Sequence, residues 1–219
     1  MILAPLPQNG VPLGRRLSQL YAGLTLYGAS MALMIRGNIG LDPWDVFNQG
    51  LTRVTHLSFG TIVIVSGLLI LLLWIPLRQR PGVGTISNVF VIGIAVDAFL
   101  RVVPDSSSGY ESAILLLSGV FLNGLAGALY IGAGLGPGPR DGLTIGLVDR
   151  TGKSIRLIRT IIELSVLAIG WAMGGTVGIG TVAYALLIGP ILHVLLPRFT
   201  LKSRESVEIQ SEIIETNLA

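Results

Sequence analysis

The chain contains no cysteine and only two histidines, His56 and His193. The absence of cysteine excludes disulfide bonds, thiolate nucleophiles, iron–sulfur clusters and cysteine-ligated zinc. Two histidines far apart in the sequence do not predict a conventional metal site. The sequence also lacks a Gly-x-Ser-x-Gly nucleophile elbow and a phosphate-binding loop that ends in Gly-Lys-Ser or Gly-Lys-Thr. We therefore expect neither an enzyme nor a bound cofactor or metal.

Charge is also scarce. Asp, Glu, Lys and Arg make up 12% of the 219 residues, hydrophobic residues make up 51%, and the mean hydropathy is +0.75. Soluble domains carry about 25% charged residues. A bilayer core needs about 20 apolar helical residues per crossing. These numbers predict an all-α membrane protein that forms one membrane domain over residues 1–219. The six apolar segments that we expect to cross are residues 17–35, 58–77, 84–103, 113–132, 155–173 and 178–196.

The net charge of +3 and the pI near 9.6 are distributed unevenly along the chain. With a cytoplasmic N-terminus, twelve of the 15 Lys and Arg residues fall on the inner side, and only Arg36, Arg53 and Arg101 lie outside. The positive-inside rule accounts for this bias without a nucleic-acid partner. Both termini are thus expected in the cytoplasm, as polar or flexible ends over residues 1–14 and 202–219. Residues 1–14 do not have the order of a signal peptide, because the arginines follow the apolar stretch.

An internal repeat is the most informative feature. A shift of 96 residues aligns the two halves of the chain without a gap, and it matches Pro43 with Pro139, Asp45 with Asp141, and residues 82–85 (GVGT) with 178–181 (GIGT). The copies extend over residues 17–103 and 113–197, and each holds three of the predicted spans. An odd number of spans places the second copy upside down in the bilayer. Inverted repeats of this kind are frequent in secondary transporters.

The segment after the first span of each copy predicts a short extra helix that begins at Pro43 or Pro139. Proline suits the first helical position, where no N–H donor is needed. Asp42 is the expected N-cap of the first helix, and Asp45 and Asp141 stand where a carboxylate can bond back to the cap. One interpretation is that the aspartates only start helices. The other is that both helices are re-entrant and bring their N-termini together as a substrate or ion site.

Ionisable and polar groups inside the predicted spans are further candidates for a substrate or ion pathway, because they are costly at membrane depth. Arg159 and Glu163 are four residues apart and can pair on one helix face. Asp97 can pair in the same way with Arg101, and its counterpart in the second copy is His193. The remaining pathway candidates are Asn88, inside the third span, and Arg140, beside Asp141.

The chain resembles a family of bacterial integral membrane proteins, the YczE/YyaS/YitT group, and most of all its YczE-like branch. The resemblance covers nearly the whole chain except the polar tail. It is carried by residues 40–47 (GLDPWDVF), 74–85 (WIPLRQRPGVGT), 134–143 (GLGPGPRDGL), 151–156 (TGKSIR) and 174–181 (GGTVGIGT). It implies a multi-pass protein of the bacterial inner membrane. It implies no reaction and no catalytic residues.

Two functions are compatible with these features. The first is a small permease-like transporter of a small solute, an ion or a lipid headgroup. The basic residues on the inner side are compatible with an anionic substrate, although the positive-inside rule explains them more simply. The second is an accessory or scaffold protein that transports nothing. The expected partners are the lipid bilayer and, for the transporter, a small solute. A homo-oligomer or a membrane partner is compatible with both.

Overall fold

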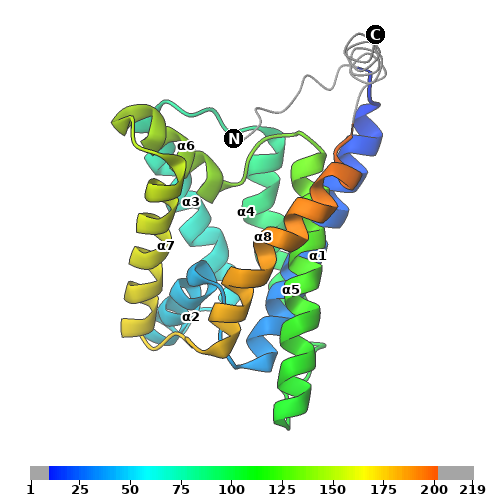
Figure 1. The fold of residues 1–219 in the computed structure, drawn as a ribbon, viewed down its shortest axis with the longest axis vertical. Coiled ribbons are helices and arrows are strands. Elements are labelled where there is room, and N and C mark those ends of the chain that lie inside the picture. Colours follow the sequence, from blue (N-terminus) through cyan, green and yellow to red (C-terminus); the bar gives the residue numbers. More distant parts are fainter. Residues whose placement is uncertain (1–9, 202–219) are drawn as a thin grey trace, which may run out of the picture.

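The computed structural model describes residues 10–201, and the chain over this range is helical, with no strand. The described part of the chain forms eight helices (Figure 1). They are α1 (Leu13–Gly37), α2 (Pro43–Thr55), α3 (Phe59–Leu77), α4 (Val83–Leu100), α5 (Gly109–Gly132), α6 (Pro139–Thr151), α7 (Ile155–Ala172) and α8 (Ile179–Phe199). Of the predicted polar ends, 1–9 and 202–219 lie outside the described residues, and Leu13 and Gly14 already belong to α1.

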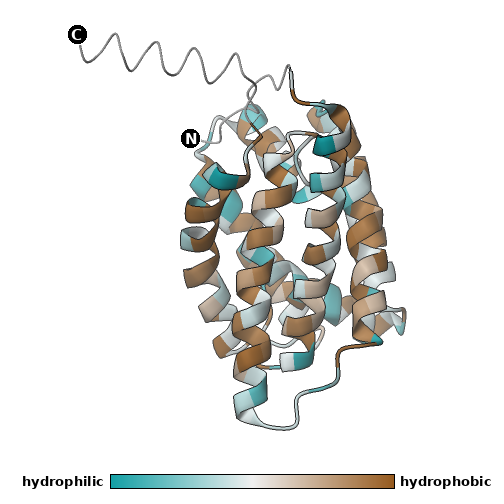
Figure 2. Cartoon of the chain, turned by 90° about the vertical axis from the view of Figure 1, so that its right-hand side faces the viewer, coloured by the Kyte–Doolittle hydropathy of each residue, from teal (hydrophilic) through white to brown (hydrophobic). Residues whose placement is uncertain are grey.

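Four of these helices, α3, α4, α5 and α8, are long and apolar enough to cross a membrane. All six predicted segments are helical, with ends close to those expected. α1 and α7 are also long, at 25 and 18 residues, but α7 carries Arg156, Arg159 and Glu163, and α1 carries several polar residues. Hydrophobic residues recur along the lengths of the long helices in Figure 2. The chain is an integral membrane protein, and membrane crossing by α1 and α7 stays a prediction.

The helix boundaries repeat along the chain. α2 and α6 both have 13 residues, and they begin at Pro43 and Pro139, which are 96 residues apart. The starts of α3 and α7, and of α4 and α8, are separated by the same interval. We call residues 17–103 the first half and residues 113–197 the second half. The sequence repeat is therefore accompanied by a repeat of helix order and helix length.

Two central helices, α1 and α5, pack along each other, α1 also contacts α4, and α5 contacts α8. Small residues allow these close approaches. A Cβ on Gly23 of α1 would lie 2.8 Å from the Tyr130 backbone nitrogen, and a Cβ on Gly28 would lie 2.8 Å from the Val96 nitrogen. In lipid, where apolar helices gain little from leaving the solvent, such close packing holds helices together.

Each short helix packs against a long helix of the other half. α2 packs against α7 of the second half, and α6 packs against α3 of the first half. α2 and α6 lie toward opposite ends of the bundle (Figure 1). Gly50 of α2 faces the backbone of Gly170, and Gly142 of α6 lies under the indole ring of Trp74. The Trp74 Nε1–H also donates to the Pro139 carbonyl at 3.1 Å.

Two backbone hydrogen bonds between the halves are reciprocal. The Gly84 N–H donates to the Leu135 carbonyl, and the Gly180 N–H donates to the Ile39 carbonyl, both at 2.8 Å. Each donor and each acceptor in one bond lies 96 residues from its counterpart in the other. Gly40 and Gly136 stand next to these acceptors with φ values of +125° and +123°, a region of backbone space that glycine occupies at little cost.

The halves differ in how their last two helices pack. α3 packs along α4, whereas α7 and α8 make little contact. A Cβ on Gly93 of α4 would lie 2.5 Å from Ile64 Cγ1 and 2.7 Å from the Gly60 carbonyl oxygen, but a Cβ on its counterpart, Gly189, would meet nothing within 4 Å. We call the α3–α4 pair of the first half closed, because its helices pack together, and the α7–α8 pair of the second half open, because its helices do not.

This difference gives a matched test. We expect Gly93→Ala to lower the free energy of unfolding by about 1–3 kcal/mol, because the added methyl group has to displace packed neighbours. We expect Gly189→Ala to be neutral or to raise the free energy of unfolding by up to about 1 kcal/mol, because its site is open and alanine favours the helix. Thermal unfolding of both variants in detergent measures this difference. Equal losses would contradict the open arrangement of α7 and α8.

Candidate functional site

The starts of the two short helices meet through an ion pair between the halves. The Arg140 guanidinium, at the start of α6, lies 3.8 Å from Asp42 Oδ1 and 3.7 Å from Asp45 Oδ1 at the start of α2. The two carboxylates are 3% and 0% exposed, whereas the Arg140 side chain is 30% exposed. The guanidinium carbon also stands 4.9 Å from the centre of the Trp44 ring, within the range of a cation–π contact. We call Asp42, Asp45 and Arg140 the helix-start cluster.

The predicted role of Asp42 is confirmed. Its Oδ1 accepts hydrogen bonds from the backbone N–H groups of Trp44 at 2.9 Å and Asp45 at 3.2 Å, and Pro43 takes the first helical position. Pro139 takes the same position in α6. In α6 the N-cap is Gly138, which has no side chain to accept a bond.

The predicted bond from each third-position aspartate back to its cap is wrong for this structure. Neither carboxylate oxygen of Asp45 has a hydrogen-bond partner, although both are buried. Asp141 instead accepts a hydrogen bond from the Tyr130 hydroxyl at 3.1 Å. Contacts with distant parts of the chain thus decide the positions of both carboxylates: Asp45 faces Arg140 of the other half, and Asp141 faces a tyrosine of α5.

Tyrosines and amides surround the cluster inside the bundle. The Tyr184 hydroxyl of α8 donates to Asn123 Oδ1 at 3.0 Å, and the Asn123 amide donates to Ser30 at 2.9 Å. Tyr27 and Tyr130 form an edge-to-face pair with ring centres 6.2 Å apart. Tyr27 and Tyr130 were not predicted as parts of the site. A tyrosine within an apolar helix is a usable signal, because its hydroxyl needs a partner there.

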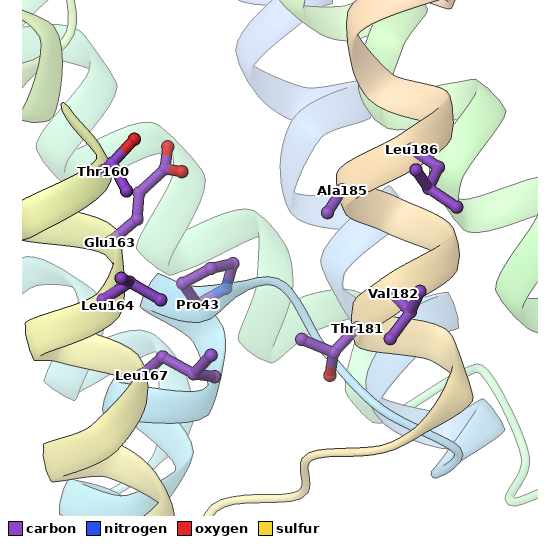
Figure 3. Close-up of a pocket in the computed structure, with 9 residues that line it drawn as sticks. All are labelled: Pro43, Thr160, Glu163, Leu164, Leu167, Thr181, Val182, Ala185 and Leu186. Carbon is purple, nitrogen blue, oxygen red and sulfur yellow. The ribbon is translucent and has the colours of Figure 1, made fainter. Parts of the chain in front are cut away.

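A pocket of about 310 Å³ opens between α7 and α8, and the start of α2 lies in it (Figure 3). Thr160, Glu163, Leu164 and Leu167 line one wall from α7. Thr181, Val182, Ala185 and Leu186 line the other wall from α8, with Pro43 between the two helices. The pocket is mainly apolar, and it occupies the space that remains because α7 and α8 do not pack together. Pro43, which follows Asp42 in the chain, belongs to the pocket wall, whereas Asp42, Asp45 and Arg140 themselves do not line the pocket.

Arg159 and Glu163 form the predicted pair on one face of α7, with 2.8 Å between Arg159 Nε and Glu163 Oε1. Their side chains are 60% and 37% exposed, and Glu163 lines the pocket. Of the eight candidates for a substrate or ion pathway that the sequence suggests, only Glu163 contributes to the pocket wall. The place of the others in a shared pathway stays a prediction.

The predicted pair of Asp97 with Arg101 is wrong. Asp97 accepts hydrogen bonds from the Ser58 hydroxyl at 2.5 Å and the Gly60 N–H at 2.7 Å, so it joins α4 to the start of α3. Those donors satisfy the carboxylate better than a flexible arginine side chain at the helix end. His193, its counterpart on α8, is exposed. Asn88 lies beside Gly138, the N-cap of α6, with its amide nitrogen 3.6 Å from the place of a Cβ there.

Within residues 10–201, no three His, Asp or Glu side chains gather into a group able to hold a metal ion. The helix-start cluster offers instead two buried carboxylates, one guanidinium and neighbouring hydroxyl groups. Chemically, such an arrangement can bind a small charged species or move a proton.

The family model described as "Family of unknown function (DUF6198)" matches residues 14–197. The uncharacterized membrane protein YczE of Bacillus subtilis is 36% identical over 180 residues, which cover 81% of this chain and 84% of that protein. An uncharacterized protein of Haemophilus influenzae is 33% identical over 182 residues, with 83% and 84% covered. YyaS of Bacillus subtilis is 28% identical over 179 residues, with 80% and 89% covered. No solved structure matches the chain. The resemblance to YczE and YyaS is thereby confirmed.

Proposed function

The chain belongs to the DUF6198 family of membrane proteins, and we propose that it is a small permease-like transporter whose binding site is the helix-start cluster. The observation that carries the proposal is the ion pair of Arg140 with Asp42 and Asp45. It joins the first turns of two short helices that belong to different halves of the chain. Transporters built from repeats commonly bind their substrates and coupling ions at the ends of such short or broken helices.

The reciprocal contacts support two halves in opposite orientations. The bonds from Gly84 to Leu135 and from Gly180 to Ile39, together with the exchanged packing of α2 and α6, are what a two-fold relation between the halves would produce. The placement of α2 and α6 toward opposite ends of the bundle also supports opposite orientations of the two halves (Figure 1). In this proposal, α1 and α7 also cross the membrane, which gives six spans, both termini lie in the cytoplasm, and the protein resides in the bacterial inner membrane.

The difference between the halves supports alternating access. α3 and α4 are closed around Gly60 and Gly93, while α7 and α8 are parted around the pocket. If the two halves exchange these arrangements, the cluster opens first to one side of the membrane and then to the other. Such an exchange needs two packings of similar free energy rather than a continuous deformation. The substrate is a small solute, an ion or a lipid headgroup that fits a pocket of about 310 Å³.

Uptake into proteoliposomes tests the proposal. Radiolabelled amino acids, sugars, organic cations and carboxylates serve as probes, and empty liposomes give the background. We expect at least one probe to enter faster with the protein present. Asp45→Asn should then reduce that uptake by about tenfold or more, because a hydrogen bond from a bound substrate to the charged carboxylate contributes about 1.5–3 kcal/mol. Asp141→Asn, outside the cluster, tests the second helix start in the same assay.

Asp105→Asn is the matched control, because the Asp105 side chain is 80% exposed and its ion pair with Arg36 lies outside the cluster; its uptake should equal that of the parent. Equal uptake by all four proteins would remove the aspartates from the mechanism. No uptake of any probe above background would favour the accessory or scaffold function instead.

A further inference from the structure

The helix-start cluster holds one more negative charge than positive charge. Asp42 and Asp45 are two buried carboxylates, and Arg140 is the one cation within 4 Å of either of them among the described residues. A buried charge without a partner is costly, since desolvation is not repaid by an attractive partner. If both carboxylates are ionised, the second of them lacks its own counter-charge.

Three buried oxygen atoms in this cluster have no hydrogen-bond partner. They are Asp42 Oδ2 and both carboxylate oxygens of Asp45, which is 0% exposed. Asp42 Oδ1, by contrast, is occupied by the two backbone N–H groups that it caps. Buried polar atoms are satisfied in the great majority of cases, so a group of unsatisfied oxygens indicates a ligand that belongs there.

The elements around the two carboxylates contribute one guanidinium and several neutral polar groups. α6 contributes Arg140. α1 contributes Tyr27, which packs edge-to-face on Tyr130, and the Tyr184 hydroxyl of α8 donates to Asn123 Oδ1 at 3.0 Å. On α2, Asn48 is buried; its side-chain oxygen accepts a hydrogen bond from Ser66 of α3 at 3.0 Å, and its amide nitrogen has no hydrogen-bond partner. On α7, Arg159 and Glu163 are paired with each other. Among the described residues, no cation other than Arg140 lies within 4 Å of either carboxylate.

We propose that Asp42 and Asp45 together bind one monovalent cation, a proton or an alkali ion, beside the Arg140 guanidinium. One bound positive charge makes the cluster neutral and supplies a partner for the unpartnered oxygens. A divalent ion fits poorly, because calcium and magnesium take six or more oxygen ligands, and the guanidinium already provides one positive charge. The inference builds on the proposed function, in which this cation is the coupling ion, but the binding itself is measured without transport.

Thermodynamic linkage tests the site on the purified full chain in detergent. A cation that binds only to the folded site is released on unfolding. If the cation is a proton, there is a pH range in which the folded site holds it and an unfolded aspartate does not. In that range the unfolding equilibrium constant rises about tenfold per pH unit. An alkali-ion site makes the same constant fall about tenfold for each tenfold rise in ion concentration above its dissociation constant. The pH series is run in choline chloride, and the ion series uses NaCl or KCl against choline chloride at fixed pH.

Asp45→Asn removes one charge at nearly constant shape, so we expect it to flatten whichever dependence the parent shows. Asp42→Asn is the second variant, because asparagine retains an oxygen that caps α2, and it should flatten the dependence too. Asp105→Asn, at an exposed position, should keep the parent's dependence. A parent that responds to neither pH nor alkali ions, or responses that persist in both cluster variants, would overturn the site.

The outcomes separate this inference from the proposed function. If a probe is taken up but stability depends on no cation, the cation site is rejected and the transporter function is retained. If stability depends on a cation in the parent but not in Asp45→Asn, and no probe is taken up, the cation site is retained and the transporter function is rejected. A dependence on pH alone identifies a proton, and a dependence on sodium or potassium identifies an alkali ion.

Discussion

Replacing Arg140 with methionine is expected to lower the free energy of unfolding by about 3 kcal/mol. Losing one member of a buried ion pair costs about 3–5 kcal/mol, because the remaining charge stays buried without compensation. Here two carboxylates, 3% and 0% exposed, depend on one guanidinium. The lower end of the range applies, because the guanidinium itself is partly exposed and some of its interaction is screened. Reversible unfolding in mixed micelles measures the change.

Two variants make this result specific to the cluster. Arg159→Met removes a cation whose side chain is 60% exposed, and we expect a loss of at most about 0.5 kcal/mol. The double variant Arg140→Met with Asp45→Asn should recover part of the stability that the single Arg140 variant loses, because it also removes one uncompensated carboxylate. The interaction free energy follows from the double-mutant cycle. Equal losses in Arg140→Met and Arg159→Met would contradict the importance given to the cluster.

Replacing Trp74 with alanine is expected to cost about 3–5 kcal/mol, the range for deleting a large buried aromatic side chain. Trp74 is 2% exposed and packs with Ile70 and Leu143. Its indole ring covers Gly142, and its N–H bonds to the Pro139 carbonyl, so it holds the start of α6 against α3. The same unfolding measurement applies.

Trp74→Phe is the matched control. It retains most of the ring and loses the 3.1 Å hydrogen bond to Pro139, so we expect a loss of about 1 kcal/mol. Because α6 carries Arg140, the alanine variant should also weaken the uptake that depends on the cluster. Stability in Trp74→Ala equal to that in Trp74→Phe would show that the ring does not position α6.

Local patterns predicted the helices and their repeat well. Long apolar runs determined the six long helices, and the prolines at 43 and 139 determined the starts of the short ones, because both signals act within a few residues of the chain. The Arg159–Glu163 pair was found for the same reason, since its partners are one helical turn apart. The Asp42 cap belongs to this group as well.

Contacts between distant segments were not predictable in the same way. Arg140, Asp42 and Asp45 were each predicted from local sequence patterns, but their pairing was not, because it depends on how the two halves are placed relative to each other. Asp97 shows the limit of spacing rules. Arg101 stands at the correct interval, yet donors from the start of α3 bind the carboxylate instead. The difference in packing between α3–α4 and α7–α8 is also a tertiary property that hydropathy does not report.

The account depends most on two halves that insert in opposite orientations, so that the helix-start cluster is reached from either side of the membrane. Thr55 and Thr151 test it directly, because they end α2 and α6, are both exposed, and lie 96 residues apart. The chain has no cysteine of its own, so Thr55→Cys and Thr151→Cys each provide one thiol for a membrane-impermeant maleimide. We predict labelling of Thr55→Cys in intact cells, and of Thr151→Cys only after the membrane is permeabilised. Labelling of both from the same side would contradict the inverted arrangement and the transport proposal that rests on it.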